Sequence, residues 1–179
     1  VHNRYGRTIK DFECDGGTEF NNDFVRRLGL KHGFSVSMTS PYNPNQNPFS
    51  ERKNRAIQEA TDAMLYDGNV PPYHWQDAAR YAVWLQNQTP HSGLKFKTPS
   101  QTLKKSKTVD KRFTTYAKPF GCSAYAHIPK ELRRKGPKVF KSVKCVFLGL
   151  SPNRNAPLLY DPKTKKVLDR SNVTFVETQ

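Results

Sequence analysis

Residues 8–38, TIKDFECDGGTEFNNDFVRRLGLKHGFSVSM, contain three successive structural patterns. Residues 8–14 have the composition of a short strand, and the two glycines after Asp15 allow a sharp turn. Residues 34–38 alternate apolar and polar side chains, which is typical of a half-buried strand. Residues 21–30 predict a short amphipathic helix between them, with apolar residues one turn apart at Phe24 and Leu28. The stretch therefore predicts a β-α-β unit with Asp15 at the end of its first strand.

The next segment changes from loop to helix. Residues 40–48, SPYNPNQNP, hold three prolines and three asparagines, which exclude a helix or a central strand and predict an exposed loop that includes Pro48. Ser50 is a suitable N-cap for a helix over residues 51–65. Glu51 then lies in the first turn, where the helix dipole favours a carboxylate.

The second half changes from helix to strand. Residues 73–87 predict a helix that carries Trp75 and Trp84, which we expect in the core. From residue 113 onward, short β-rich runs alternate with Gly, Pro and Asn clusters, at residues 122–128, 144–148, 158–160, 166–168 and 173–176. Residues 161–164, DPKT, are a plausible hairpin turn. The tail is thus predicted to be a small all-β barrel or sandwich.

Charge divides the chain unevenly. Residues 1–90 contain 10 basic and 10 acidic residues, whereas residues 91–179 contain 20 and 5, so the whole net charge of +15 lies in the second half. Such an excess points to an anionic polymer as partner, although a merely soluble lysine-rich surface has the same composition. No apolar run approaches the ~20 residues that span a bilayer, so we expect no membrane association. Three cysteines without metal spacing give no zinc site and indicate a reducing compartment, nuclear or cytoplasmic.

Asp15 and Glu51 are separated by 35 residues in a strand, loop and helix pattern. Carboxylates at a strand end and a helix start can converge on one cation, and oxygen ligands suit Mg²⁺ or Mn²⁺ in phosphodiester chemistry. Each residue also has a simpler explanation. Asp15 fits a turn before glycine, and Glu51 fits a helix N-terminus.

The sequence strings around these carboxylates resemble retroelement integrases. DGGTEF at residues 15–20 and SPYNPNQN at 40–47, followed by ERKNR at 51–55, are most similar to the Ty1/copia branch. Four strings in the tail are similar to the SH3-like module that follows the core in copia polyproteins: FGCSAY at 120–125, CVFLGLS at 145–151, LYDP at 159–162 and DRSNV at 169–173. The resemblance covers nearly the whole chain.

The resemblance implies an α/β RNase H-like integrase core, lacking its first strands, in residues 1–90. A basic linker with a short helix would occupy residues 91–112, and an SH3-like β-barrel residues 113–179. The family's catalytic set is Asp, Asp and Glu. Asp15 would be its second metal carboxylate and Glu51 its third, with the first expected upstream of Val1, so we expect no activity from this chain alone. Pro48 stands where family members usually have glycine, and we expect it to stiffen the loop.

The resemblance also implies partners: element and target DNA, Mg²⁺ or Mn²⁺ in the complete enzyme, and other copies of the protein. Candidate DNA-binding residues are polar or basic and lie in the loop, the following helix and the tail: Tyr42, Gln46, Asn47, Arg52, Lys53, Arg55, Lys130, Arg133, Arg134, Lys135, Lys138, Lys141 and Lys144. The predicted function is that of the C-terminal part of a retrotransposon integrase. The alternative is a non-catalytic DNA-binding or protein-interaction module derived from one.

Overall fold

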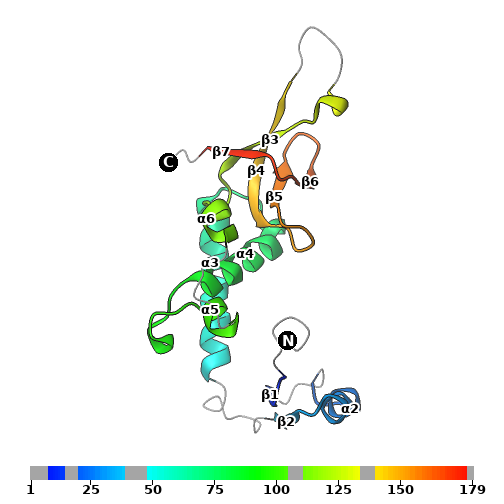
Figure 1. Ribbon diagram of the computed structural model, residues 1–179, viewed down its shortest axis with the longest axis vertical. Helices are drawn as coiled ribbons and strands as arrows, with labels where there is room; N and C mark the ends of the chain where they lie inside the picture. Colours follow the sequence, from blue (N-terminus) through cyan, green and yellow to red (C-terminus); the bar gives the residue numbers. More distant parts are fainter. Residues whose placement is uncertain (1–7, 15–19, 39–47, 105–110, 134–139, 177–179) are drawn as a thin grey trace. The chain divides into compact units, whose positions relative to one another are not determined.

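The computed structural model describes residues 8–14, 20–38, 48–104, 111–133 and 140–176 (Figure 1). The chain divides into two compact units, residues 1–56 and 57–179. Within the described residues, none of the helices has the length and apolar character needed to cross a membrane.

The first unit contains the predicted β-α-β pattern. Strand β1 (Asp11–Cys14) and strand β2 (Ser35–Met38) are parallel, with Cys14 opposite Met38, and helix α2 (Asp23–His32) connects them. The Asn22 side chain caps α2 by accepting a hydrogen bond from the Val25 amide at 3.0 Å. Gly33 ends it in the left-handed conformation, with a φ of 70°. The prediction of strand, helix and strand is confirmed.

The predicted apolar face of α2 is open to solvent within the described residues. Phe24 is 71% exposed, and Leu28 is exposed as well. The buried position of the helix is instead Gly29, where a Cβ atom would stand 2.8 Å from the Phe34 carbonyl oxygen. The helix therefore approaches β2 through a glycine and not through its large apolar side chains.

Helix α3 (Pro48–Asp67) is longer than predicted. It begins at Pro48, which was expected in the loop, so the prediction of Ser50 as N-cap is wrong. The physical reason is that proline lacks only an amide that the first turn leaves unpaired, and its fixed φ suits a first helical position. Glu51 still lies in the first turn, as predicted.

Three α-helices and two 3-10 turns lie between α3 and the first strand of the tail in the described part of the chain. They are η2 (Pro72–His74), α4 (Trp75–Gln88), η3 (Ser92–Leu94), α5 (Pro99–Lys104) and α6 (Lys111–Tyr116). Helix α5 begins with a reciprocal cap, because the Thr98 hydroxyl accepts from the Gln101 amide and the Gln101 side chain accepts from the Thr98 amide, each at 3.0 Å. The predicted helix over 73–87 is confirmed as α4 to within two residues.

The two tryptophans of α4 have different environments. Trp84 is half-buried and stacks on Tyr81, with ring centroids 5.5 Å apart. Trp75 is 55% exposed, so its assignment to the core is wrong. Trp75 is the first residue of the helix, and its ring lies on the exposed side of the first turn. The buried positions of α4 are Ala78, Tyr81, Ala82 and Gln88.

The tail forms a five-stranded antiparallel sheet in the order β6-β5-β4-β3-β7. Its strands are β3 (Ser123–His127), β4 (Ser142–Leu150), β5 (Pro157–Asp161), β6 (Lys166–Asp169) and β7 (Val173–Val176), with η4 (Lys130–Leu132) between β3 and β4. All five predicted strands are present. The predicted turn at residues 161–164 joins β5 to β6, and the Asp161 carboxylate accepts from the Lys163 amide and the Thr164 hydroxyl at 2.9 and 2.8 Å.

One hydrophobic core joins the helices to this sheet. Tyr81 of α4 is almost fully buried and meets Phe147 of β4 edge to face, with centroids 5.4 Å apart. Its hydroxyl reaches the Lys118 carbonyl at 2.7 Å and the Lys118 amide at 3.1 Å. Val70, Ala78 and Phe120 belong to the same cluster, and α4 lies against β4 (Figure 1). The core therefore crosses residue 90, the predicted end of the first domain.

Candidate functional site

The two candidate metal carboxylates differ in how much of their setting is described. Asp15 lies outside the described residues, although β1 ends at Cys14, the residue before it. Glu51 is exposed in the first turn of α3, where the helix dipole stabilises its negative charge. Within the described part of the chain, no hydrogen bond or ion pair engages the Glu51 carboxylate. It is therefore open to a ligand from solvent.

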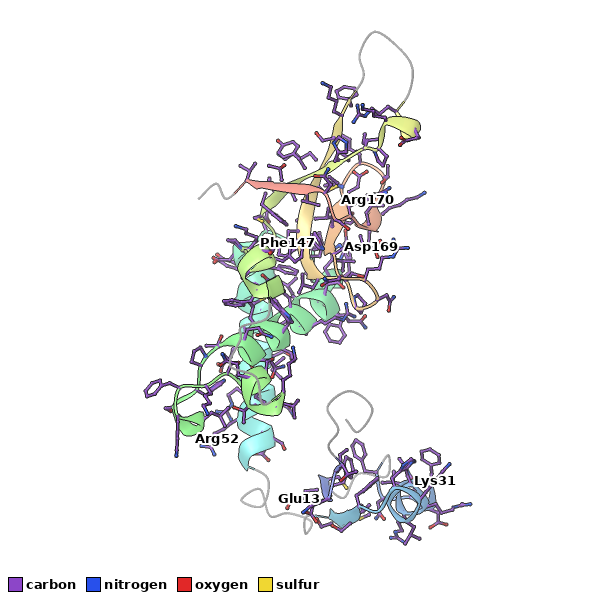
Figure 2. The ribbon with its side chains drawn as sticks, viewed as in Figure 1. Glu13, Lys31, Arg52, Phe147, Asp169 and Arg170 are labelled. Carbon is purple, nitrogen blue, oxygen red and sulfur yellow. The ribbon has the colours of Figure 1, made fainter. Side chains whose placement is uncertain are left out.

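Three basic candidates follow Glu51 on the same helix. Arg52, Lys53 and Arg55 are all exposed, and Figure 2 labels Arg52 near the start of α3. Arg55 lies four residues after Glu51 and so shares its face of the helix. A cation and a carboxylate on one exposed face are chemically suited to a phosphate and its metal counter-ion. The loop candidates Tyr42, Gln46 and Asn47 lie outside the described residues.

The tail candidates fall partly within the described residues. Lys130, Arg133, Lys141 and Lys144 are described, whereas Arg134, Lys135 and Lys138 are not. Lys130 begins η4, and Lys141 and Lys144 are exposed on either side of the start of β4. These described cations therefore lie on or beside the β3 and β4 strands.

Arg133 is held in place by a histidine to which no sequence pattern assigned a role. Its Nε donates to the Ile128 carbonyl, and its Nη2 donates to His127 Nε2, both at 2.9 Å. Because a guanidinium can only donate, His127 Nε2 must accept, which places the imidazole proton on Nδ1. The hydrogen bond between His127 and Arg133 could not be predicted from residue spacing, since His127 shows no ligand pattern. The outward position of His127 does follow from the alternation of side chains along a strand.

The solvent-facing side of β3 and its neighbours combines an aromatic ring with cations. Along β3, Ala124 and Ala126 are buried, and Tyr125 and His127 face outward. Tyr125 is directly opposite Lys144 of β4 and Thr174 of β7, and it is 38% exposed. We use the name outer face for Tyr125, His127 and Lys144 on this side of the sheet, together with Arg133, which bonds to His127, and Lys141, which precedes β4. Interleaved aromatic and basic side chains are what nucleic-acid surfaces use to stack bases and contact phosphates.

No group of three or more His, Cys, Asp or Glu side chains is gathered into a metal site among the described residues. Cys14 and Cys145 are buried, and burial raises the pKa of the Cys145 thiol, with a further contribution from Asp161. Buried protonated thiols behave as small core residues.

Comparison with known proteins gives matches along the whole chain. Residues 122–179 match the retroviral polymerase SH3-like domain. The chain is similar to the retrovirus-related Pol polyprotein from transposon TNT 1-94 of Nicotiana tabacum, with 32% identity over all of this chain and 13% of the relative. It is also similar to the polyprotein from transposon RE1 of Arabidopsis thaliana, with 32% identity over 99% of this chain and 12% of the relative. The chain thus spans about an eighth of these relatives.

Two solved structures show a partial likeness. The catalytic core domain of BIV integrase superposes with a TM-score of 0.42 and 24% identity, over 56% of this chain and 62% of that one. The simian T-cell lymphotropic virus intasome in complex with the PP2A regulatory subunit B56 gamma superposes with a TM-score of 0.49 and 18% identity, over 96% of this chain and 60% of that one. The sequence relatives and the matched domain carry the assignment: the chain corresponds to a region of retrotransposon Pol polyproteins that contains a retroviral polymerase SH3-like domain.

Proposed function

We propose that this region binds DNA during integration of a retrotransposon and contributes Asp15 and Glu51 to a strand-transfer site that depends on a divalent metal. The observation that carries the proposal is the position of Glu51, exposed in the first turn of α3 beside Arg52, Lys53 and Arg55. The order of the sequence motifs around Glu51 supports the same conclusion. Asp15 follows β1, and the 35 residues between Asp15 and Glu51 match the spacing of the last two catalytic carboxylates in the family that the chain resembles.

Asp15 and Glu51 are the residues that would hold Mg²⁺ or Mn²⁺, since both offer the hard oxygen donors that these ions prefer. When bound, such an ion supplies activation of the attacking oxygen and stabilisation of the leaving oxygen in phosphodiester transfer. The basic side chains that follow Glu51 on α3 would contribute DNA contacts next to this metal ion. Arg55 shares the face of Glu51 and would hold a DNA phosphate near the carboxylates, while Arg52 and Lys53 contact neighbouring phosphates.

The outer face supplies a second DNA contact. Lys141 and Lys144 would pair with backbone phosphates, and Tyr125 would stack on a base or pack on a sugar. Arg133, fixed by His127 and the Ile128 carbonyl, enters such a contact with its side chain already ordered. In the complete protein we propose that several copies act together on paired DNA ends.

The test is DNA affinity of the 179-residue chain, measured by fluorescence anisotropy with a 20-base-pair duplex across a KCl series, with and without Mg²⁺. We expect Lys141→Gln/Lys144→Gln to flatten the salt slope by about 2, because each phosphate contact contributes roughly 0.9 to it. We expect Asp15→Asn/Glu51→Gln to keep DNA binding without Mg²⁺ and to lose any increase in affinity on adding Mg²⁺. Lys163→Gln/Lys165→Gln, at two exposed lysines of the β5–β6 turn outside the proposed DNA contacts, removes the same charge and is the matched control.

A second candidate function is a DNA-binding module without catalysis. The uneven charge supports it, because all of the positive excess lies after residue 90 in the sequence, in the half that does not contain Asp15 and Glu51. The same titration separates the two. Mg²⁺-dependent affinity that survives removal of both carboxylates would support the non-catalytic module and contradict the metal site.

A further inference from the structure

A pocket of about 520 Å³ lies between α4 and the β5–β6 end of the sheet. Its walls come from three places: Asp77 and Arg80 of α4, the loop between β4 and β5, and strands β5 and β6 with the residue that follows β6. None of the proposed DNA contacts involves this pocket, so a ligand bound there would be independent of the proposed function.

The polar wall of this pocket is held by two ion pairs. Arg80 Nη1 lies 3.0 Å from Asp77 Oδ1 on α4, and Arg154 Nη1 lies 3.2 Å from Asp169 Oδ1 at the end of β6. The second pair ties the β4–β5 loop to β6. Each ion pair orients its arginine, although the Arg154 side chain remains 71% exposed.

A buried hydroxyl fixes the same loop from inside. Ser151 is only 8% exposed, and its Oγ donates to Asp169 Oδ2 at 3.3 Å. The same oxygen accepts from the Asn153 and Arg154 amides at 3.4 and 3.2 Å. The loop is therefore braced against the carboxylate of Asp169, which means that the pocket is formed before any ligand arrives.

The pocket is lined by one more basic side chain than acidic side chains. Its lining contains three arginines and two aspartates, and the ion pairs account for both aspartates. Arg170, labelled beside Asp169 at the end of β6 in Figure 2, is exposed and has no hydrogen bond or ion pair among the described residues. One negatively charged group would complete the set.

The same pocket runs along a free sheet edge. Strand β6 is the first strand of the order β6-β5-β4-β3-β7, so one side of it has no partner strand in the described chain. Alternate residues of such a strand offer unpaired N–H and C=O groups. Val167 is 47% exposed on this edge, and Leu158 and Leu168 also line the pocket. An apolar surface beside a free edge is suited to an extended chain.

We propose that this pocket and the β6 edge bind an extended acidic peptide segment of a partner protein by strand addition. Its backbone pairs with β6, an apolar side chain rests on Leu168, and a carboxylate side chain on the same side of the peptide pairs with Arg170, two residues further on. A DNA strand is less suited to the site, because two of the three lining arginines are already paired with aspartates, and Arg170 alone is left for a polymer that carries one charge per nucleotide. A peptide carries a single carboxylate to one position and leaves the aspartates paired.

The test uses the 15N-labelled 179-residue chain and the fluorescein-labelled heptapeptide Thr-Val-Thr-Glu-Thr-Val-Thr, whose Val and Glu side chains share one face when extended. We expect amide shift changes at residues 166–170 and not at β7, the other sheet edge. We expect binding to weaken about tenfold for Arg170→Gln, as for loss of one charge-assisted hydrogen bond. Lys163→Gln, an exposed lysine outside the pocket with the same loss of charge, should leave affinity unchanged.

Two further probes separate the alternatives. A heptapeptide with Gln in place of Glu should bind about tenfold more weakly to the unmodified chain but equally to Arg170→Gln, since the pair is then already lost. A peptide N-methylated at alternate residues should not bind, because it cannot pair with a strand edge. Shift changes at 166–170 on adding duplex DNA but not peptide would overturn the proposal in favour of nucleic acid. Equal changes at β6 and β7, or none with any peptide, would also overturn it.

Discussion

Gly149 of β4 packs directly on the ring of Tyr81 of α4. A Cβ atom at position 149 would stand 2.8 Å from the Tyr81 Cβ and 2.9 Å from its Cγ, and Gly149 has a φ of +95° that other residues rarely adopt. The contact joins the helical part of residues 57–179 to the sheet at a point where no side chain fits. The stability of both elements therefore depends on a glycine in the middle of a strand.

Gly149→Ala should destabilise the chain for two reasons, steric overlap with Tyr81 and the strained φ. We expect the free energy of unfolding to fall by about 2–4 kcal/mol, measured by urea denaturation. Gly93→Ala is the control, because a Cβ at Gly93 meets nothing within 4 Å and its φ is ordinary. Equal stability of the two variants would contradict the close packing of Gly149 on Tyr81.

Tyr81→Phe tests the polar end of the same residue. Burial raises the pKa of the Tyr81 phenol well above its ordinary value, so the hydroxyl stays protonated and bonded to the Lys118 backbone. Removing it takes one hydrogen bond from the Lys118 carbonyl and one from the Lys118 amide, which still donates to the Tyr116 carbonyl at 2.9 Å, and we expect a loss of about 1–3 kcal/mol. Tyr66→Phe, at an exposed tyrosine of α3, should change the free energy of unfolding by less than about 0.5 kcal/mol.

Asp161 should make the second unit sensitive to acid. Although burial alone would raise it, hydrogen bonds from the Thr164 hydroxyl and the Lys163 and Thr164 amides lower the pKa of Asp161 from its ordinary value of 3.8. The unfolded chain then binds a proton more readily than the folded one, so the stability that Asp161 contributes above pH 3.8 is lost as pH falls through the folded-state pKa.

Asp161→Asn should have a lower free energy of unfolding than the unmodified chain at pH 7. The two free energies should become equal once the pH is below the folded-state pKa of Asp161. Circular dichroism of the unfolding transition at a series of pH values measures this difference. Glu59→Gln, at an exposed carboxylate of α3, should show the same dependence of stability on pH as the unmodified chain. A stability difference for Asp161→Asn that does not shrink in acid would show that the carboxylate charge is not what matters.

Tyr125→Ala should weaken binding of single-stranded DNA more than binding of duplex. Stacking on a base contributes about 1–3 kcal/mol, and only unpaired bases offer an open face. Tyr125→Phe should keep most of the affinity, since the ring remains, and Tyr66→Ala should have no effect. Anisotropy with a 20-nucleotide oligonucleotide and its duplex gives both values, and an equal loss for the Phe and Ala variants would argue against stacking.

The strands and the βαβ unit could be predicted because each depends on local pattern. Alternation in residues 34–38 and the Gly, Pro and Asn clusters of the tail are decided within a few residues of each element. Trp75 and Phe24 could not be placed in the same way. A large apolar residue on an amphipathic helix is buried only where another element covers it, and helical spacing does not say how far that cover extends.

The start of α3 shows a second limit. The proline-rich string over residues 40–48 excludes a helix interior but not a helix start, and Pro48 is compatible with a first turn. Asp15 and Glu51 could be proposed as metal ligands because two carboxylates with a fixed spacing can be recognised in a sequence, and they remain a prediction. The pocket could not be predicted in this way, since its lining comes from α4, the β4–β5 loop and β6, which only the tertiary fold brings together.

The burial of Tyr81 against Phe147 limits how this region can be divided by experiment or by recombination. A fragment that begins at residue 113 would keep every strand of the sheet but would expose Phe147 and the hollow beside Gly149 to water. Such a fragment should aggregate or remain partly folded. A recombination event between two retrotransposons that transfers the SH3-like domain as a unit would therefore have to transfer α4 with it. Otherwise the recipient would have to supply a helix with an aromatic residue in the place of Tyr81.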